Sequence, residues 1–222
     1  MAIFADRLQA GQELAKRIKL PENAVIFAIP RGGVPVGYAL SKAFKLPFDI
    51  IVVRKLPVPW SPEAGFGALT LDGRVILNPE FKGLLSPKTI EEIARVVHQE
   101  VLRRNEVYRG GKGYKDLKGK VAVVVDDGFA SGYTAIAAAN FLRKFSPEAV
   151  VAVAPVCPKH TKELLKNYFD EVYCLVESEE LPFAVASFYR DFHDLTDEEV
   201  LAFVEDLKRE GLFFPEVESE NG

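Results

Sequence analysis

The sequence has 222 residues, 48% of them hydrophobic and 27% charged, which suits one α/β domain with an ordinary core. Its formal net charge of −4 argues against a protein that coats nucleic acid. No run approaches the roughly 20 apolar residues of a membrane span, and two cysteines are too few for a disulfide framework or a four-thiolate zinc site. We therefore expect a cytoplasmic protein that binds neither nucleic acid nor membranes.

Short apolar runs alternate with helical patterns along most of the chain. After a helical run at residues 5–18, the expected strands lie at residues 25–29, 49–53, 121–125, 150–154 and 172–176. The helices expected between these strands lie at residues 34–44, 134–145 and 159–168. Continuous apolar strands that alternate with helices predict an α/β fold, with a central parallel sheet of about five strands flanked by helices.

Two segments interrupt this alternation. Between the second and third strands, the turn Asp72-Gly73 predicts a β-hairpin, and a long helix is expected over residues 87–109 with Ser86 as its N-cap. After residue 176 the pattern breaks until Thr196, which opens a last helix with Glu199 as its capping-box partner.

We expect a single domain over residues 1–222. Its parts are a core at about 20–176, a hairpin and long-helix insertion at about 56–115, a small C-terminal hood at about 177–210 completed by the N-terminal helix, and a flexible tail at 215–222.

The segment that carries the chemistry follows the third expected strand. Asp126 and Asp127 directly follow the strand at residues 121–125. A loop of mostly small residues comes next, and Thr134 opens the next helix. At the carboxyl end of a parallel strand, such a loop lets backbone N–H groups approach a phosphate, and the helix terminus adds partial positive charge. The two carboxylates can accept hydrogen bonds from sugar hydroxyls, so the segment fits a ribose 5-phosphate. The plain alternative is a strand-end turn with an Asp helix cap.

This segment, VAVVVDDGFASGYT, resembles the PRPP-binding motif of the type I phosphoribosyltransferases. The resemblance covers all but the tail and implies a Rossmann-like sheet with a flexible loop and a variable hood. It is closest to a poorly characterised branch of the family. It implies that Asp126 and Asp127, the catalytic candidates, bind the ribose hydroxyls of PRPP. The 5-phosphate would lie against the loop residues Gly128, Phe129, Ala130, Ser131, Gly132, Tyr133 and Thr134.

Two further segments agree with the resemblance. One follows the first expected strand, where the family has its pyrophosphate loop, and the other is a basic pair at the end of the second strand, as in adenine-type members. For these two segments together, the resemblance implies that pyrophosphate is bound by Pro30, Arg31, Gly32, Gly33, Arg54 and Lys55. Taken alone, the first segment has a plain strand-to-helix turn as its alternative, and the second has a solvated basic pair.

The expected hood contains the candidates for recognition of a base. Phe188, Tyr189 and Asp191 lie in a stretch similar to the aromatic-then-Asp segment of hypoxanthine-type enzymes. The resemblance implies that one of the two aromatic rings stacks on the base and that Asp191 lies near magnesium. The lysine that reads a purine in those enzymes has no counterpart at residues 176–178, so the acceptor base stays open.

The resemblance therefore predicts a Mg²⁺-dependent transferase that moves the ribose 5-phosphate of PRPP to a nitrogenous base and releases pyrophosphate. Mg²⁺ would be held mainly by substrate oxygens. The alternative is a non-catalytic regulatory protein of the same fold that binds PRPP or a nucleotide. Many members of the family are dimers, so a homodimer is the oligomer to test.

Overall fold

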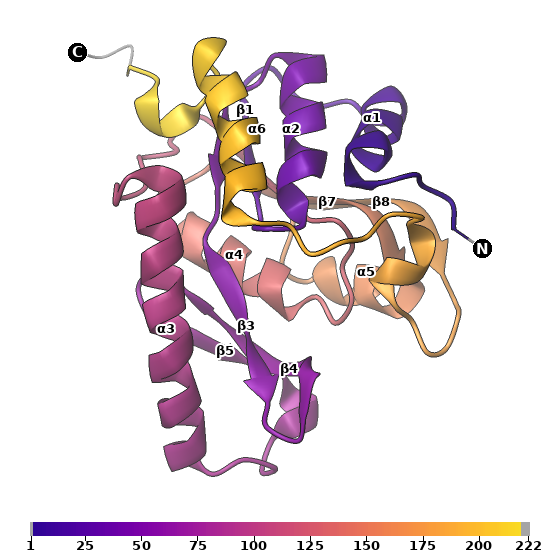
Figure 1. The fold of residues 1–222 in the computed structure, drawn as a ribbon, viewed down its shortest axis with the longest axis vertical. Helices are drawn as coiled ribbons and strands as arrows, with labels where there is room; N and C mark the ends of the chain where they lie inside the picture. The colour runs from indigo at the N-terminus through magenta and orange to yellow at the C-terminus, as the bar shows by residue number, and fades with distance from the viewer. Residues whose placement is uncertain (1, 219–222) are drawn as a thin grey trace.

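A five-stranded parallel sheet forms the centre of the protein, whose computed structural model describes residues 2–218 (Figure 1). The strand order is β2 (Phe48–Ile50), β1 (Ala24–Ala28), β6 (Val121–Val125), β7 (Ala149–Pro158) and β8 (Glu171–Ser178). The predicted number and direction of the strands are confirmed. Every residue of the neighbouring strands β1 and β6 is buried, as expected for strands that are covered on both faces.

Helices cover both faces of this sheet. One face carries α1 (Arg7–Arg17), α2 (Gly33–Phe44) and α6 (Asp197–Arg209), and the other carries α4 (Tyr133–Arg143) and α5 (Lys159–Leu165) (Figure 1). Because successive strand residues point to opposite faces, Ile26 and Val123 pack in the core of the first face. Their neighbours Phe27 and Val124 pack in the core of the second.

A second, antiparallel sheet of three strands stands beside the first. It consists of β3 (Val53–Val58), β4 (Ser61–Thr70) and β5 (Val75–Leu77). The predicted hairpin is present, since the Gly73 N–H donates to the Thr70 carbonyl and Gly73 takes a φ of +81°. The sequence interpretation was wrong in one respect, because residues 49–53 do not form one strand. The Ile51 N–H still donates to the Ala28 carbonyl of the parallel sheet, but Val53 already pairs with Thr70 of the second sheet.

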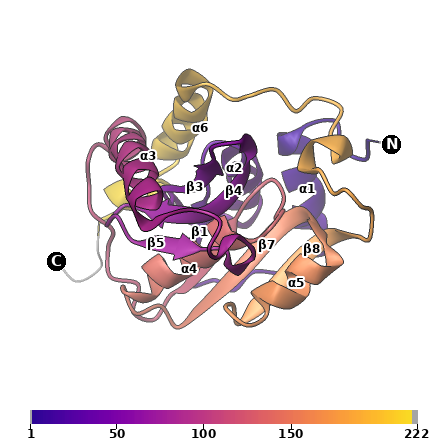
Figure 2. The same cartoon turned by 90° about the horizontal axis from the view of Figure 1, so that it is seen from below.

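The long helix α3 (Pro87–Arg109) follows the 3₁₀ turn η1 (Pro79–Phe81) and begins and ends where the sequence predicts. The Ser86 hydroxyl accepts a hydrogen bond from the Thr89 N–H, and Gly110 ends the helix with a positive φ. Figure 2 shows α3 beside α6, along the side of the second sheet. At its end the helix is tied to the main sheet by a buried ion pair, with Arg109 Nε 2.8 Å from Asp49 Oδ1.

The hood is built from both ends of the chain. The segment after β8 contains the turn η2 (Val185–Phe188), and the N–H groups of Ile3 and Phe4 donate to the carbonyl of Phe188. The predicted capping box of Thr196 and Glu199 opens α6. None of the helices in residues 2–218 has the length and apolar character that crossing a membrane requires.

Two details differ from the sequence interpretation. Residues 215–218 do not all belong to a tail, because η3 (Phe214–Glu216) is anchored by buried Phe214, whose carbonyl accepts a hydrogen bond from Lys115; residues 219–222 lie outside the described residues. Cys157 and Cys174 form a single disulfide between the paired strands β7 and β8. Two cysteines exclude a framework of several bridges. Whether they form one bridge depends on how the strands pair, which the cysteine count does not reveal.

Candidate active site

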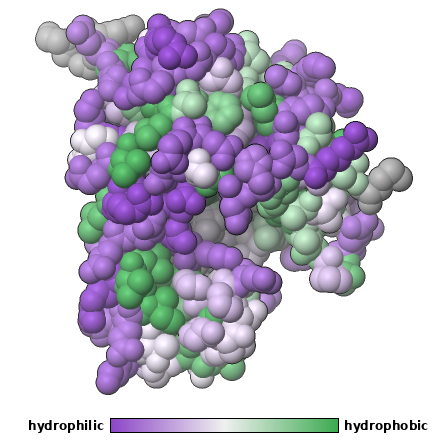
Figure 3. All heavy atoms as spheres, in the orientation of Figure 1, coloured by the Kyte–Doolittle hydropathy of each residue, from purple (hydrophilic) through white to green (hydrophobic). Residues whose placement is uncertain are grey.

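The predicted binding segments meet at the carboxyl ends of β1 and β6, where the ligands of parallel sheets usually bind. A cavity of about 1030 Å³ lies there, and its lining includes Asp126 and Asp127, the loop after β1, and the basic pair Arg54 and Lys55. Figure 3 shows a hollow below α6 whose border is largely hydrophilic. The acidic pair, the loop after β1 and the basic pair are spread over about a hundred residues of sequence, and they line the same cavity.

A second cavity of about 370 Å³ lies against the loop after β6. Its lining contains Gly128 and every residue from Ala130 to Thr134, and it shares Lys55, Asp126 and Thr134 with the first cavity. The side chain of Phe129 is buried instead, and its N–H donates to the Val156 carbonyl, so this residue anchors the loop. The predicted 5-phosphate loop therefore surrounds a space of its own beside the acidic pair.

The two acids have different surroundings. Asp126 Oδ1 accepts a hydrogen bond from the Asp127 N–H at 2.8 Å. Burial, and next the charge of Asp127, raise the pKa of Asp126 well above its usual range. Asp127 Oδ2 is 3.0 Å from Nε of Arg7, and both side chains are almost completely buried. The acidic pair thus combines a carboxyl that favours the neutral form with a carboxylate held by an arginine.

Arg7 connects the acids to the hood. Its Nη1 donates to the carbonyl of His193 at 2.8 Å, and its guanidinium lies 3.9 Å from the centre of the Phe192 ring. The hydroxyl of Tyr189 donates to the backbone carbonyl of Asp127 at 2.6 Å. The N-terminal helix and the hood therefore both fix the position of Asp127.

Glycine at position 32 permits close packing between the first loop and the acidic pair. A Cβ built on Gly32 would lie 2.1 Å from Asp127 Oδ2. A Cβ on Gly33 would lie 2.6 Å from the Val125 carbonyl oxygen, behind the loop. These approaches give a chemical reason for the Gly-Gly pair: the loop after β1 and the acids after β6 touch each other.

If PRPP binds against Asp127, as the resemblance predicts, Gly32→Ala should weaken its binding about tenfold or more, because the new methyl group must push the Asp127 carboxylate out of its position. Isothermal titration calorimetry with PRPP measures this change. Gly113→Ala is the matched control, since a Cβ on Gly113 meets nothing within 4 Å. An unchanged affinity in Gly32→Ala would contradict the placement of PRPP against Asp127.

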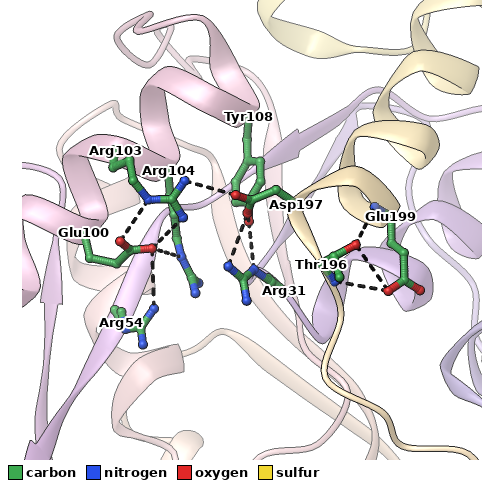
Figure 4. A network of polar contacts seen from close by, with 9 residues as sticks. All are labelled: Arg31, Arg54, Glu100, Arg103, Arg104, Tyr108, Thr196, Asp197 and Glu199. Atoms are coloured by element: carbon green, nitrogen blue, oxygen red, sulfur yellow. Dashed lines mark hydrogen bonds and ion pairs between the residues drawn. The ribbon is translucent and has the colours of Figure 1, made fainter.

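A network of arginines and acids closes one side of the cavity (Figure 4). Arg31 Nε donates to the Tyr108 hydroxyl at 3.0 Å, and its Nη2 lies 3.3 Å from Asp197 Oδ1. Arg103 binds both Asp197, at 3.0 Å, and Glu100, at 2.7 Å. The loop after β1 is thereby connected to α3 and to the first turn of α6.

Glu100 is a shared acceptor in this network. Its Oε1 lies 3.1 Å from Arg104 Nε and 3.8 Å from Arg54 Nη1, besides its contacts with Arg103. The hydrogen bonds from Arg103, and then those from Arg104, lower the pKa of Glu100 to about 2. Lys55 instead donates to the Glu63 carbonyl at 2.5 Å, and burial lowers its pKa.

The low pKa of Glu100 predicts a loss of stability in acid. Because the folded pKa lies below the ordinary 4.5, the contribution is complete above that pH and disappears as the pH falls toward about 2. Acidification over this range should lower the free energy of unfolding of the Glu100→Gln variant by about 1 kcal/mol less than that of the wild type, after allowance for solvent screening. Urea unfolding at a series of pH values measures it, and identical acid profiles would contradict the assignment.

Most of the predicted residues lie together. The first cavity is lined by Pro30, Arg31, Gly32, Arg54, Lys55, Asp126, Asp127 and Thr134. The hood candidates do not face it: Phe188 and Tyr189 pack with Phe4 in a buried cluster, and exposed Asp191 bonds to His193. Both rings contribute to the core of the hood, and Phe192 is the aromatic residue that lines the cavity, so a stacking role of Phe188 or Tyr189 stays a prediction.

Sequence reasoning missed Arg7, Phe192, Glu100, Arg103 and Arg104 as lining residues. Arg7 lies in a helix without a motif, and the arginines of α3 have the pattern of a solvated helix face. The spacing of Glu100, Arg103 and Arg104 by three and four residues was the available signal, since such positions share one side of a helix.

Comparison with known proteins assigns the chain to a family. A family model described as the phosphoribosyl transferase domain matches residues 77–193, more than half of the chain. The chain belongs to the phosphoribosyl transferase family. The resemblance of residues 121–134 to phosphoribosyltransferases is thus confirmed at the level of the family.

Relatives extend the phosphoribosyl transferase match to nearly the whole chain. Two proteins of Mycobacterium tuberculosis, from strains CDC 1551 and H37Rv, are 40% identical over 214 residues, and each bears the name phosphoribosyl transferase as a provisional assignment. The match covers 95% of this chain and 48% of each relative, so the chain spans about half the length of the curated relatives it matches. The crystal structure of the protein TT1426 from Thermus thermophilus is 32% identical, with a TM-score of 0.73 over 92% of this chain and 98% of that one.

Proposed function

We propose that this chain transfers the ribose 5-phosphate of PRPP to a nitrogenous base and releases pyrophosphate. One observation carries the proposal: the acidic pair stands between two spaces, one beside the small-residue loop after β6 and one beside the loop after β1. Because the two spaces share Asp126 and Thr134, a sugar with a phosphate at each end can extend through both. Membership of the phosphoribosyl transferase family supports the same assignment.

In this proposal each segment binds a different part of PRPP. The backbone N–H groups of the loop after β6 and the N-terminus of α4 hold the 5-phosphate. Asp127 and Asp126 accept hydrogen bonds from the two ribose hydroxyls. The diphosphate lies toward Gly32, Arg31 and Arg54, where positive charge is concentrated.

The proposed reaction breaks the bond from C1 to the diphosphate oxygen and forms a bond from C1 to a ring nitrogen of the base. The bond electrons leave with the diphosphate, and the ring proton of the base passes to the departing diphosphate or to water. A displacement with an oxocarbenium-like transition state requires orientation and charge stabilisation more than a protein nucleophile. The arginines and the Gly-Gly loop stabilise the leaving diphosphate, while the acids hold the ribose in place.

Mg²⁺ fits this scheme as a companion of PRPP. Within residues 2–218, no group of three His, Cys, Asp or Glu side chains is arranged to hold a metal. The proposal assigns the ion mainly to oxygens of the substrate, because Mg²⁺ prefers such hard oxygen ligands. Asp126 and Asp127 supply the hard oxygen atoms nearest to the bound sugar. When bound, the ion neutralises charge on the leaving diphosphate.

The experiment that tests the proposal has two parts. PRPP is first titrated calorimetrically in the presence of Mg²⁺, with tight binding expected. Pyrophosphate release is then measured with purine and pyrimidine bases supplied one at a time, and release with one class identifies the acceptor. Binding without release would favour the regulatory alternative, whereas failure to bind PRPP would refute the proposed transferase and leave a nucleotide-binding regulator, which titration with nucleotides tests.

A further inference from the structure

The insertion contains an apolar cavity that includes none of the predicted site residues. Its volume is about 430 Å³, and it lies beside the start of α3, at the end of the molecule opposite α2 and α6 (Figure 1). Apolar side chains from β4, β5, η1 and the first part of α3 with the residues before it form its walls: Phe66, Leu77, Pro79, Phe81, Leu85 and Ile90. The polar side chains in this lining are those of exposed Lys82 and buried Asn78.

The amide group of Asn78 is only half paired, although the residue is 5% exposed. Its Oδ1 accepts a hydrogen bond from the Glu80 N–H at 3.0 Å, which fixes which end of the amide is the oxygen. Among residues 2–218, Nδ2 has no acceptor, yet no fully buried side-chain nitrogen in this range lacks one. Nδ2 therefore reaches open space, and the cavity that Asn78 lines is where it can donate.

The backbone of Asn78 holds this donor in place. The Asn78 N–H donates to the Phe66 carbonyl at 2.8 Å, and the Asn78 carbonyl accepts from the Phe81 N–H at 3.0 Å. The side-chain NH₂ group is thus the part of the residue that is left for a ligand. A fixed donor without a partner in an apolar wall carries a free-energy cost, which an acceptor on a bound molecule would remove.

We infer that this cavity binds a small apolar ring molecule that offers one hydrogen-bond acceptor to Asn78. Ligand sites are commonly apolar with a few polar groups that set the orientation of the ligand. An apolar cavity of about 150 Å³ holds one benzene ring, so the cavity beside α3 has room for two fused rings. A ring that presents an N–H at the same position would face another donor and should bind more weakly.

The cavity also has a connection to the active site. Asn78 and Phe81 line both this cavity and the cavity against the loop after β6, and Glu80, which lies between them in the chain, lines the latter. A molecule that bonds to Asn78 and packs on Phe81 therefore acts on a wall of the space assigned to the 5-phosphate. Occupancy should change the affinity for ribose 5-phosphate, and the coupling is reciprocal. This effector role rests on the proposed function, whereas binding of the ring does not.

A second copy of the chain is the other occupant to test. Leu77 lines the cavity and is 48% exposed, so an apolar side chain of another copy would find an apolar surface there. Such a side chain would leave Asn78 Nδ2 without an acceptor, which is why the structure favours a small molecule. A dimer that Leu77→Lys dissociates in sedimentation experiments would overturn the inference.

The main test is titration of the full chain with quinoline and, separately, with indole, followed by ¹⁵N NMR. Both probes have two fused rings of similar size, but the ring nitrogen of quinoline accepts a hydrogen bond and that of indole donates one. Quinoline should shift the side-chain amide signals of Asn78 and bind about tenfold more tightly than indole. Equal affinities, or Asn78 signals that do not move, would overturn the inference.

Two variants check the location. Asn78→Asp keeps an oxygen for the Glu80 N–H but replaces the donor, so the quinoline affinity should fall about tenfold; Asn167→Asp, in an exposed turn, is its control. Ile90→Phe fills part of the cavity and should weaken both probes, whereas Leu102→Phe changes an exposed residue of α3 outside the cavity. Thermal unfolding checks that each variant is folded. Wild-type quinoline affinity in both Asn78→Asp and Ile90→Phe contradicts the site.

The effector role has its own measurement. Ribose 5-phosphate is titrated calorimetrically with and without saturating quinoline, and a change in affinity of about threefold or more supports the role. An identical affinity overturns the effector role. A chain in which quinoline shifts the Asn78 signals but which binds neither PRPP nor ribose 5-phosphate refutes the proposed function and leaves the ring-binding site intact.

Discussion

Replacement of both Asp126 and Asp127 by asparagine should lower the affinity for PRPP about a hundredfold while the chain remains folded. Each acid is assigned a ribose hydroxyl, and the hydrogen bond to the Asp127 carboxylate, which Arg7 holds, should contribute about 1.5–3 kcal/mol as a bond to a charged group. Most of the loss should come from Asp127→Asn. Burial, and next the charge of Asp127, raise the pKa of Asp126 and so disfavour the charge that Asp126→Asn would remove. Calorimetry on the two single variants and the double variant measures these contributions.

The control for this series is Asp116→Asn, which changes an exposed turn acid that accepts a hydrogen bond from the Lys118 N–H. It should bind PRPP as the wild type does. Because Asp127→Asn removes the ionic partner of Arg7, thermal unfolding must accompany each titration. An unchanged PRPP affinity in a folded double variant would remove the main support for the proposed function.

Arg109→Met should destabilise the fold by about 3–5 kcal/mol, because it leaves the buried carboxylate of Asp49 without its partner. Both side chains are at most 2% exposed. Arg109 Nη1 also donates to the Asn105 side chain at 2.8 Å, and its guanidinium stacks 3.6 Å from the Tyr114 ring centre. For a chain of this length, a loss of this size corresponds to a melting temperature lower by roughly 10 °C. Urea unfolding with linear extrapolation measures the difference.

A double variant distinguishes loss of the ion pair from loss of packing. Asp49→Asn combined with Arg109→Met should be more stable than Arg109→Met alone, because the uncompensated charge is gone. Arg95→Met, an exposed change on the same helix, should cost little. If Arg109→Met unfolds at the same urea concentration as the wild type, the ion pair does not fasten α3 to the sheet.

The central sheet was predictable because its residues obey local rules. β6 is a run of five buried apolar residues, and such runs form strands that are covered on both faces. Ser86, Gly110 and Thr196 mark helix ends by capping chemistry that acts over three or four residues. The acids at the end of β6 were predictable for the same reason, because the motif directly follows the strand in the sequence.

The remaining features depend on contacts between distant segments. Arg7 reaches Asp127 across 120 residues, and no spacing rule describes such a contact. The split between β2 and β3 follows from pairing of Val53 with Thr70, which competes with continuation of the parallel sheet. The aromatic residues of the hood were assigned by analogy, and their burial depends on packing against Phe4 at the other end of the chain.

The union of the N-terminal segment with the hood has a practical consequence for protein production. The carbonyl of Phe188 accepts hydrogen bonds from Ile3 and Phe4, and the carbonyl of Phe4 accepts one from Arg190. Arg7 follows only a few residues later and holds Asp127. Removal of residues 2–7 would therefore disturb Asp127, the acid to which the proposed function assigns a ribose hydroxyl. Assays of the acidic pair should therefore use chains in which residues 2–7 are unchanged.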